Sequence, residues 1–344
     1  MKITRIIATA LASLTLAGLG LSATAFGADI VTKAPKVAPA PEPSPWDFAA
    51  GGSLNSDYIF RGITQSAHKP SAWAYFEPRY NVTKDVQLYI GAGGESIDFP
   101  NHAAAEVDFY GGIRPTFGPV TFDLGFWYYW YPGGTTFNGL GPATTCTNLF
   151  FTPTGGCNTL KGDVSFWEVY GKVTWTATDQ FAVGASVYYS DSVLNSGADG
   201  TYVEANAKYT FPTIPGMPSG WGLYVSGAVG HWFLGTSDQF YCTQGLVAPG
   251  VFGCVPPFPN GIPYKSYTTW NIGFAVTKSV FTVDFRYYDT NLNQGDCNAF
   301  TSDHTAIFNG SFTAINPSGV GSNWCKGTFV VTGKFDLTAM TNVK

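Results

Sequence analysis

The sequence predicts an all-β protein, a transmembrane antiparallel β-barrel of the outer-membrane type with about 12 strands, short periplasmic turns and long outer loops. Charged residues make up only 12% of the 344 residues, against about 25% in ordinary soluble domains. Apolar and polar side chains alternate with a period of two, and connections alternate between short and long. The mean hydropathy of +0.04 and the absence of long apolar runs beyond the N-terminus argue against membrane-spanning helices.

The alternation is clear in residues 105–117, AEVDFYGGIRPTF. Val107, Phe109 and Ile113 share one face, whereas Glu106, Asp108, Tyr110 and Arg114 share the other. Residues 120–131 repeat the pattern, and only a Gly-Pro pair separates the two segments. We therefore expect a tight antiparallel hairpin with one face toward lipid and the other toward water.

The same pattern recurs to the end of the chain in segments of about 10 residues, the length of a tilted membrane-spanning strand. The expected strands are 49–61, 72–82, 86–97, 105–117, 120–131, 163–177, 181–190, 201–211, 221–232, 266–277, 280–289 and 327–337. The turns at 83–85, 118–119, 178–180 and 277–279 are short, and 212–220 is a longer turn on the same side. The other side carries long polar loops rich in Gly and Pro, which is the asymmetry of outer-membrane barrels.

The N-terminus has the composition of an export signal. Lys2 and Arg5 precede an apolar stretch, and Ala23 and Ala25 form an A-x-A cleavage site. We expect residues 1–25 to be a signal peptide, with cleavage as late as residue 28, and a membrane anchor is the alternative. Residues 26–45 are Pro-rich and predict a periplasmic tether, leaving 46–344 as the barrel.

Six cysteines fall into the long loops, two in each of three loops. In an exported protein this distribution favours pairing within each loop, as Cys146–Cys157, Cys242–Cys254 and Cys297–Cys325. Such disulfides would restrain loops too long to order themselves. A metal site is the competing interpretation, but the spacings are wide and no histidine lies beside them.

Residues 55–66, NSDYIFRGITQS, place an acid and a base in an apolar, aromatic run. As part of the first strand, Leu54, Tyr58 and Phe60 would face lipid. The charges would face the lumen, because Arg or Lys at the membrane midplane costs about 2–4 kcal/mol. The same alternation predicts these pore-lining candidates: Asn55, Asp57, Arg61, Glu77, Arg79, Glu95, Glu106, Asp108, Arg114, Asp123, Glu168, Lys172, Glu204, Lys208, Asp284, Arg286 and Lys334.

Aromatic residues cluster at the strand ends, in 126–131, 187–189, 231–233 and 286–288. Lipid-facing barrels carry aromatic girdles at both membrane interfaces. A large soluble core is the alternative, but it would need more surface charge than this chain has.

Several motifs resemble one known family. SDYIFRGITQS is similar to the motif S-D-Y-x-F-R-G-x-S/T-Q-S of the TorF-type porins, also known as the Gcw_chp family of exported proteobacterial proteins. EVDFYGG, FDLGFWYYWYPG and WEVYGKVTW resemble later blocks of that family. The resemblance implies a barrel in the bacterial cell outer membrane with proposed porin activity.

Three functions fit the sequence. The first is a porin-like channel for passive diffusion of small hydrophilic solutes or ions, with weak cation preference from the acidic excess. In the competing interpretation, ion pairs made by Asp57, Arg61 and their neighbours plug the lumen. The second is a non-conducting structural or adhesive barrel with disulfide-tied surface loops.

The third function, an outer-membrane hydrolase, is the least favoured. Its only imidazoles are His68, His102, His231 and His304. Three of them lie in expected outside loops, and His231 lies at a strand end with no obvious Ser or Asn opposite. We therefore expect no enzyme, cofactor or metal. The expected partners are outer-membrane lipid, solutes or ions, and a second copy in a homo-oligomer, and not nucleic acid.

Overall fold

The computed structural model describes residues 45–139, 158–241, 244–248, 251–254 and 258–342. The signal peptide expected at 1–25 lies outside these ranges, as does all but the last residue of the tether expected at 26–45. Both stay predictions. β1 begins at Trp46, where the barrel is expected to start.

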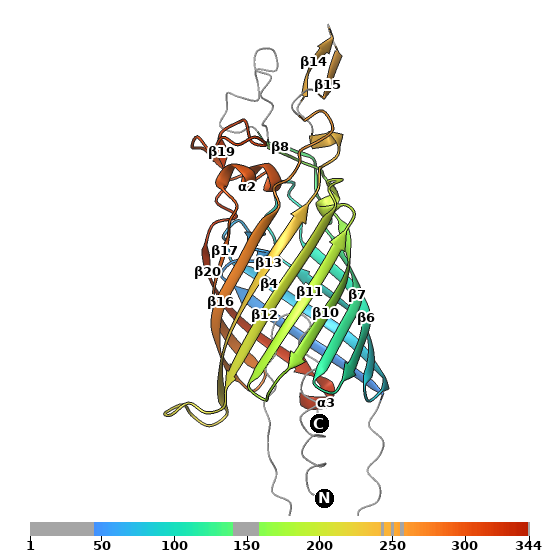
Figure 1. The fold of residues 1–344 in the computed structure, drawn as a ribbon, viewed down its shortest axis with the longest axis vertical. Helices are drawn as coiled ribbons and strands as arrows, with labels where there is room; N and C mark the ends of the chain where they lie inside the picture. The colour runs from blue at the N-terminus through green and yellow to red at the C-terminus, as the bar shows by residue number, and fades with distance from the viewer. Residues whose placement is uncertain (1–44, 140–157, 242–243, 249–250, 255–257, 343–344) are drawn as a thin grey trace, which may run out of the picture.

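Twelve antiparallel strands form one closed barrel, which confirms the predicted fold. Neighbours in the sheet follow chain order, and the last wall strand pairs with the first, Ala49 lying opposite Thr338. The wall strands are β1 (Trp46–Asn55), β4 (Ser71–Thr83), β5 (Val86–Glu95), β6 (Glu106–Phe117), β7 (Val120–Trp130), β10 (Phe166–Thr176), β11 (Phe181–Ser190), β12 (Gly200–Phe211), β13 (Trp221–Leu234), β16 (Tyr267–Lys278), β17 (Phe281–Thr290) and β20 (Thr328–Thr338). Figure 1 shows them tilted around a common axis, with α3 at the lower end and α2 at the upper end.

The connections keep the expected asymmetry. Lower connections are short except for 212–220, and upper connections carry the remaining elements. These are the hairpins β2 (Ile59–Phe60) with β3 (Ile63–Thr64), β8 (Phe137–Gly139) with β9 (Asn158–Leu160), β14 (Gln244–Ala248) with β15 (Val251–Cys254) and β18 (Ile307–Phe308) with β19 (Val320–Gly321), the 3-10 turns η2 (Val193–Asn195) and η3 (Gln239–Tyr241), and α2 (Gln294–Thr301). The chain ends in α3 (Ala339–Asn342). None of the helices in the described ranges is long and apolar enough to cross a membrane.

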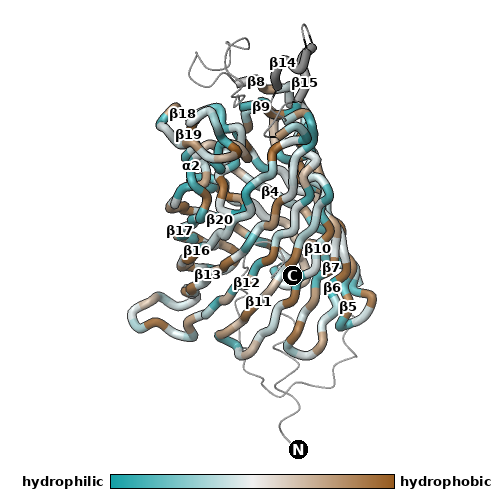
Figure 2. The backbone as a smooth tube through the Cα atoms, turned by 45° about the horizontal axis from the view of Figure 1, so that its top comes forward, coloured by the Kyte–Doolittle hydropathy of each residue, from teal (hydrophilic) through white to brown (hydrophobic). Residues whose placement is uncertain are grey.

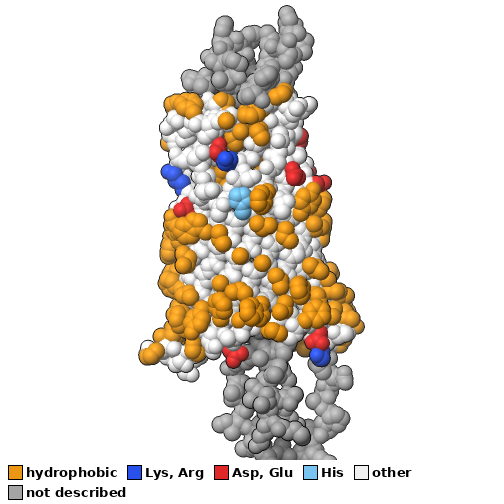
Figure 3. Space-filling view, viewed as in Figure 1, with side chains coloured by type: hydrophobic (Ala, Val, Ile, Leu, Met, Phe, Trp, Pro, Cys, Tyr) orange, Lys and Arg blue, Asp and Glu red, His pale blue; other side chains and the backbone are white. Residues whose placement is uncertain are grey.

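Large apolar side chains cover the outside of the barrel. Leu54, Ile90 and Phe281 are 70%, 67% and 62% exposed. Apolar and polar residues alternate along the strands in Figure 2, and in Figure 3 the charged side chains on the visible face lie above and below the apolar wall. Exposed aromatic rings stand near both rims, among them Trp46, Phe117, Trp175 and Trp221 at the lower rim and Trp130, Phe233, Trp270 and Phe329 at the upper rim. This surface is that of an outer-membrane barrel.

The buried core lies inside the barrel and under the outer loops. One cluster of buried side chains is built around Tyr89, Tyr110, Trp127, Tyr129 and Tyr170 on the inner wall. A second cluster joins wall residues such as Tyr202, Trp232 and Tyr267 to Phe300 and Trp324 from the connection between β17 and β20. The lumen is therefore partly filled by aromatic side chains.

The first strand ends earlier than expected. β1 stops at Asn55, so the prediction that residues 49–61 form one wall strand is wrong beyond that residue. Tyr58 and Phe60, expected against lipid, lie inside the barrel, where the Tyr58 hydroxyl donates to Glu106 and the Phe60 ring packs on Tyr129. The alternation misled because Ile59–Phe60 and Ile63–Thr64 also form strands, but in a small hairpin folded into the lumen.

Candidate functional site in the lumen

A short hairpin crosses the lumen near its outer end. β2 pairs with β3, and Arg61 and Gly62 form the two-residue turn between them. Both turn residues have positive φ, 48° and 82°, as in a type I′ turn. A Cβ on Gly62 would come within 2.4 Å of the side chains of Thr269 and Thr290, so only glycine fits here. We refer to residues 57–66 as the plug hairpin.

Hydrogen bonds fasten the plug hairpin to distant parts of the barrel. The Tyr58 hydroxyl donates to Glu106 on β6 (2.7 Å). The Tyr267 hydroxyl on β16 donates to the Arg61 carbonyl (2.9 Å), and the Thr64 amide donates to the Trp324 carbonyl (3.0 Å). The hairpin therefore obstructs the lumen at this level.

Asp57 closes the base of the plug hairpin. Its carboxylate accepts hydrogen bonds from Thr64 and Ser66 and pairs with Nδ1 of His68 at 2.7 Å. The hydrogen bond to Asp57 raises the pKa of His68 above its ordinary value, although partial burial opposes this shift. Nε2 of His68 lies 3.2 Å from the Asn323 carbonyl. Protonated His68 therefore ties the hairpin to the connection between β17 and β20.

Arg61, at the tip of the plug hairpin, is bound by one carboxylate and several rings. Its Nη1 and Nη2 donate to Oε1 and Oε2 of Glu168 on β10 at 2.8 and 2.7 Å, a bidentate pair. The Arg61 Cζ lies 4.4 Å from the ring centre of Trp232, 4.5 Å from Tyr202 and 5.0 Å from Tyr188. The guanidinium group is thus held by an ion pair and cation–π contacts.

The strand register explains how these rings meet. Tyr170 lies opposite Tyr188, Tyr188 opposite Tyr202, Tyr202 opposite Trp232, and Trp232 opposite Tyr267. Directly opposed residues point to the same side of a sheet, so five adjacent strands present one row of rings to the lumen. We refer to these five residues as the aromatic row.

The other charged candidates also lie on the inner face of the wall. On one side Arg114 donates to Glu77 (2.7 and 3.1 Å) and to Asp123 (3.2 Å), and Arg79 donates to Glu77 (2.6 Å). On the other side Arg286 donates to Asp284 at 3.1 and 2.9 Å. These six side chains are buried. Their pairing is of the kind expected in a plugged lumen.

Four further candidates are half-buried rather than buried: Lys172, Glu204, Lys208 and Lys334. Lys172 and Lys208 lie over the rings of Tyr170 and Tyr224, at 4.3 and 4.4 Å. Glu204 accepts from the Tyr202 hydroxyl at 2.9 Å. These side chains are therefore partly accessible on the inner wall.

Three carboxyl groups gather beside the plug hairpin. Glu95 and Glu106 are direct cross-strand neighbours, and Asp108 follows on the same face of β6. Glu95 accepts from Asn55 (3.1 Å) and Ser71 (3.0 Å), and Glu106 from the Tyr58 and Tyr131 hydroxyls (both 2.7 Å). Together with the other candidates, they give the inner wall an acidic excess.

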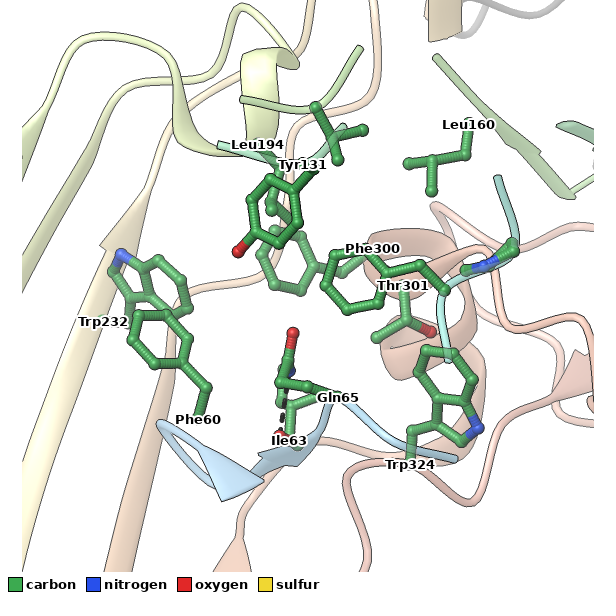
Figure 4. A pocket seen from close by; sticks show the side chains of 13 residues that line it. Phe60, Ile63, Gln65, Tyr131, Leu160, Leu194, Trp232, Phe300, Thr301 and Trp324 are labelled. Atoms are coloured by element: carbon green, nitrogen blue, oxygen red, sulfur yellow. Dashed lines mark hydrogen bonds between the residues drawn. The ribbon is translucent and has the colours of Figure 1, made fainter. Parts of the chain in front are cut away.

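A small apolar cavity of about 40 Å³ borders the plug hairpin. Phe60, Ile63 and Gln65 of the hairpin line it together with Trp232 of the wall and Phe300 of α2. Figure 4 shows Leu160, Leu194 and Tyr131 across the cavity from Phe60 and Ile63. Its volume is enough for one or two water molecules.

One of the three expected disulfides lies within the described side chains. Cys297 of α2 is bonded to Cys325, with their Cα atoms 6.0 Å apart. The bridge holds Trp324 beside the plug hairpin. The pairs Cys146–Cys157 and Cys242–Cys254 lie outside the described side chains and stay predictions.

Three of the four histidines contact a polar or acidic side chain. Asp57 stands between Ser66 and His68, so the serine hydroxyl does not meet the imidazole. His231 pairs with the Thr268 hydroxyl (2.8 Å), and His304 lies 3.6 Å from Asp98. Among described residues, no three His, Cys, Asp or Glu side chains are placed to share a metal ion.

The aromatic row is not among the features expected from the sequence. The aromatic clusters at strand ends are predicted to face lipid, but Trp127, Tyr129, Tyr188 and Trp232 turn inward and are buried or half-buried. The same period of two that placed the charges could have found them, since neighbouring residues in a strand face opposite sides. Of the cluster at 126–131, Phe126 and Trp130 do face outward.

Solved structures of low sequence identity resemble the barrel. A NanC porin is 8% identical over 84% of this chain and 100% of its own, with a TM-score of 0.38. An outer membrane channel from Pseudomonas putida F1 is 10% identical over 88% of this chain and 100% of its own (TM-score 0.38). LpxR from Salmonella typhimurium is 9% identical over 84% and 99% (TM-score 0.36).

At the sequence level, no curated protein matches significantly. A family model does match, over residues 39–220, which are more than half of the chain and include the plug hairpin. That family is described as "Bacterial protein of unknown function (Gcw_chp)". The chain therefore belongs to the Gcw_chp family.

Proposed function

We propose that the protein is an outer-membrane channel for passive diffusion of small hydrophilic solutes or ions, closed in this structure by the plug hairpin. The observation that carries the proposal is the inner wall, where charged side chains of both signs line the lumen from β4 to β20 while the outer face is apolar. Charged side chains on the inner face are what a water-filled path requires. Lys172, Glu204 and Lys208 are partly accessible on the inner wall, where such a path would run.

We also propose a weak preference for cations. Acidic side chains outnumber basic ones among the inward candidates. Glu95, Glu106 and Asp108 lie together, and Glu95 and Glu106 accept hydrogen bonds from neutral donors. Asp47 and Asp336, which are not among the sequence-based candidates, also lie on the inner side. An acidic lining attracts cations and repels anions.

Planar-bilayer recordings in a salt gradient test both statements. Discrete current steps with a reversal potential of cation sign are expected. Glu204→Gln should shift that potential toward anions and Lys208→Gln toward cations, because both half-buried side chains occupy the same strand face. A folded barrel without current steps argues against the channel, and a clear anion preference rejects only the cation preference.

The second candidate is a non-conducting structural or adhesive barrel. The Cys297–Cys325 disulfide and the filled upper lumen favour it. Trimming the outer loops separates the two, because an adhesin would lose surface binding while a channel would keep its conductance.

A catalytic role is not part of the proposal. Of the four histidines, His68 and His231 bond Asp57 and Thr268. A hydrolytic activity that persists after substitution of all four histidines would exclude histidine catalysis.

Chemical cross-linking in detergent tests the expected homo-oligomer.

A further inference from the structure

We propose that the pocket around the Arg61 guanidinium is a binding site for solutes that carry a guanidinium group, and that Arg61 occupies it in place of the solute when the channel is closed. The inference rests on the proposed channel function. The site consists of Glu168, Tyr129, Tyr188, Tyr202 and Trp232, all on the inner wall.

The walls of this site belong to the barrel, whereas its occupant does not. Tyr129 and Glu168 come from β7 and β10, and the three cation–π rings come one each from β11, β12 and β13, five consecutive neighbours in the sheet. Register holds them in place independently of the plug hairpin. Arg61 comes from a two-residue turn between strands of two residues each. The small hairpin can therefore withdraw while the site persists.

The shape of the site selects a guanidinium group. Glu168 presents both carboxylate oxygens to Nη1 and Nη2 of Arg61, at 2.8 and 2.7 Å. A flat donor fork matches this arrangement, whereas an ammonium group cannot make two parallel hydrogen bonds from separate nitrogens. Rings at 4.4–5.0 Å from Cζ then stabilise a delocalised cation through their π faces.

Electrostatics favour refilling of the site after Arg61 leaves. The Glu168 side chain is 1% exposed, and it also accepts a hydrogen bond from the Tyr129 hydroxyl at 3.2 Å. A buried carboxylate that loses its cation is strongly unfavourable, so a replacement cation is attracted. The cavity bordered by Phe60 and Trp232 adjoins two of the rings around Arg61.

Chemical rescue of full-length Arg61→Ala tests the site. Ethylguanidinium, which replaces the missing side-chain end, should raise the thermal midpoint of this variant saturably and change Trp fluorescence. It should bind at least about tenfold more weakly to Arg61→Ala/Glu168→Gln. Arg286→Ala is the matched control, because Arg286 is also paired with a carboxylate but no cation–π contact is found for it in the described ranges. Tetramethylammonium should bind Arg61→Ala more weakly than ethylguanidinium does.

The wild-type channel supplies the second readout. Agmatine at millimolar concentration should raise the open fraction or block current in a saturable way, and a neutral solute of equal length should not. If the double variant binds ethylguanidinium as well as Arg61→Ala does, Glu168 does not bind the guanidinium group and the proposed site is rejected. If Arg61→Ala is rescued but agmatine neither binds wild type nor alters its current, Arg61 is only a structural anchor and the solute site is rejected. Failure of conductance alone leaves the binding measurements intact and counts against the channel proposal instead.

Discussion

The hydroxyl of Tyr202 lies where the side chain of residue 230 would be. A Cβ on Gly230 would stand 2.2 Å from that oxygen and 2.5 Å from the ring carbon that bears it. Gly91 makes room for Tyr110 in the same way, with a contact of 2.3 Å. Glycines on the inner face of these strands therefore permit large rings to lie flat against the wall.

Gly230→Ala is expected to destabilise the barrel by about 1–3 kcal/mol, because the added methyl displaces Tyr202 from the aromatic row. Urea unfolding monitored by gel mobility measures the change. Gly333→Ala on β20 is the control, since a Cβ there meets nothing within 4 Å. Equal destabilisation by the two substitutions would contradict the packing explanation.

Glu168→Gln is expected to loosen the plug hairpin without unfolding the barrel. Breaking a buried ion pair is destabilising by about 3–5 kcal/mol. Here the substitution lowers the free energy of local opening of the hairpin rather than that of unfolding of the barrel. Exchange of the Thr64 amide, which donates to Trp324, should quicken by roughly 100-fold, and the open fraction should rise. Asp284→Asn breaks a pair elsewhere on the wall and should leave Thr64 protected. Unchanged exchange in Glu168→Gln would show that the ion pair does not hold the hairpin.

The anchoring of the plug hairpin is expected to weaken as the pH rises and His68 loses its proton. The pKa of His68 is raised by its hydrogen bond to Asp57, so the folded state favours the protonated imidazole. The stabilisation is complete below the ordinary pKa of about 6.5 and is lost as the pH rises through the raised value.

The matched variant is His68→Asn, because φ at this position is +58° and asparagine tolerates positive φ. Hydrogen exchange of the hairpin should differ between wild type and variant at pH 5, and the difference should vanish as the pH rises through the raised pKa of His68. A difference that grows with pH would show that protonated His68 does not anchor the hairpin.

Removal of the Cys297–Cys325 disulfide is expected to act on the plug hairpin at a distance. Cys297 and Cys325 have a sequence separation of 28. A bridge of this length restricts the unfolded chain and raises the free energy of unfolding by about 3–4 kcal/mol. Trp324, next to it, accepts from the Thr64 amide. A Cys297→Ser/Cys325→Ser double variant should show a higher open fraction and faster Thr64 exchange than the matched Cys146→Ser/Cys157→Ser variant. If the two variants have the same open fraction and the same Thr64 exchange rate, the Cys297–Cys325 disulfide does not hold the plug hairpin.

Leu124→Arg is expected to cost about 2–4 kcal/mol, because this outward side chain is 50% exposed on the lipid face of β7. Ser186→Arg, on the inner face opposite Lys172 and Glu204, should change stability much less and shift selectivity instead. Unfolding from lipid vesicles measures both. If Ser186→Arg destabilises the barrel more than Leu124→Arg does, the lipid-facing and lumen-facing sides of these strands are misassigned.

The sequence determined the barrel because the information is local. A period of two along each strand decides which side chains face lipid, and turn residues decide where the chain reverses. β11 therefore falls at Phe181–Ser190 as expected, and Glu77, Arg114 and Lys208 lie on the inner face as the alternation indicates.

Only the tertiary structure decided what fills the barrel. The plug hairpin has the same alternation as a wall strand, and its direction depends on contacts with residues far along the chain. Glu168 is separated from Arg61 by 107 positions, and Tyr267 by 206. The aromatic row likewise exists only because the register sets Tyr188, Tyr202 and Trp232 opposite one another. A periodic pattern fixes the face of each residue, but closure of the barrel determines which residues meet across the lumen.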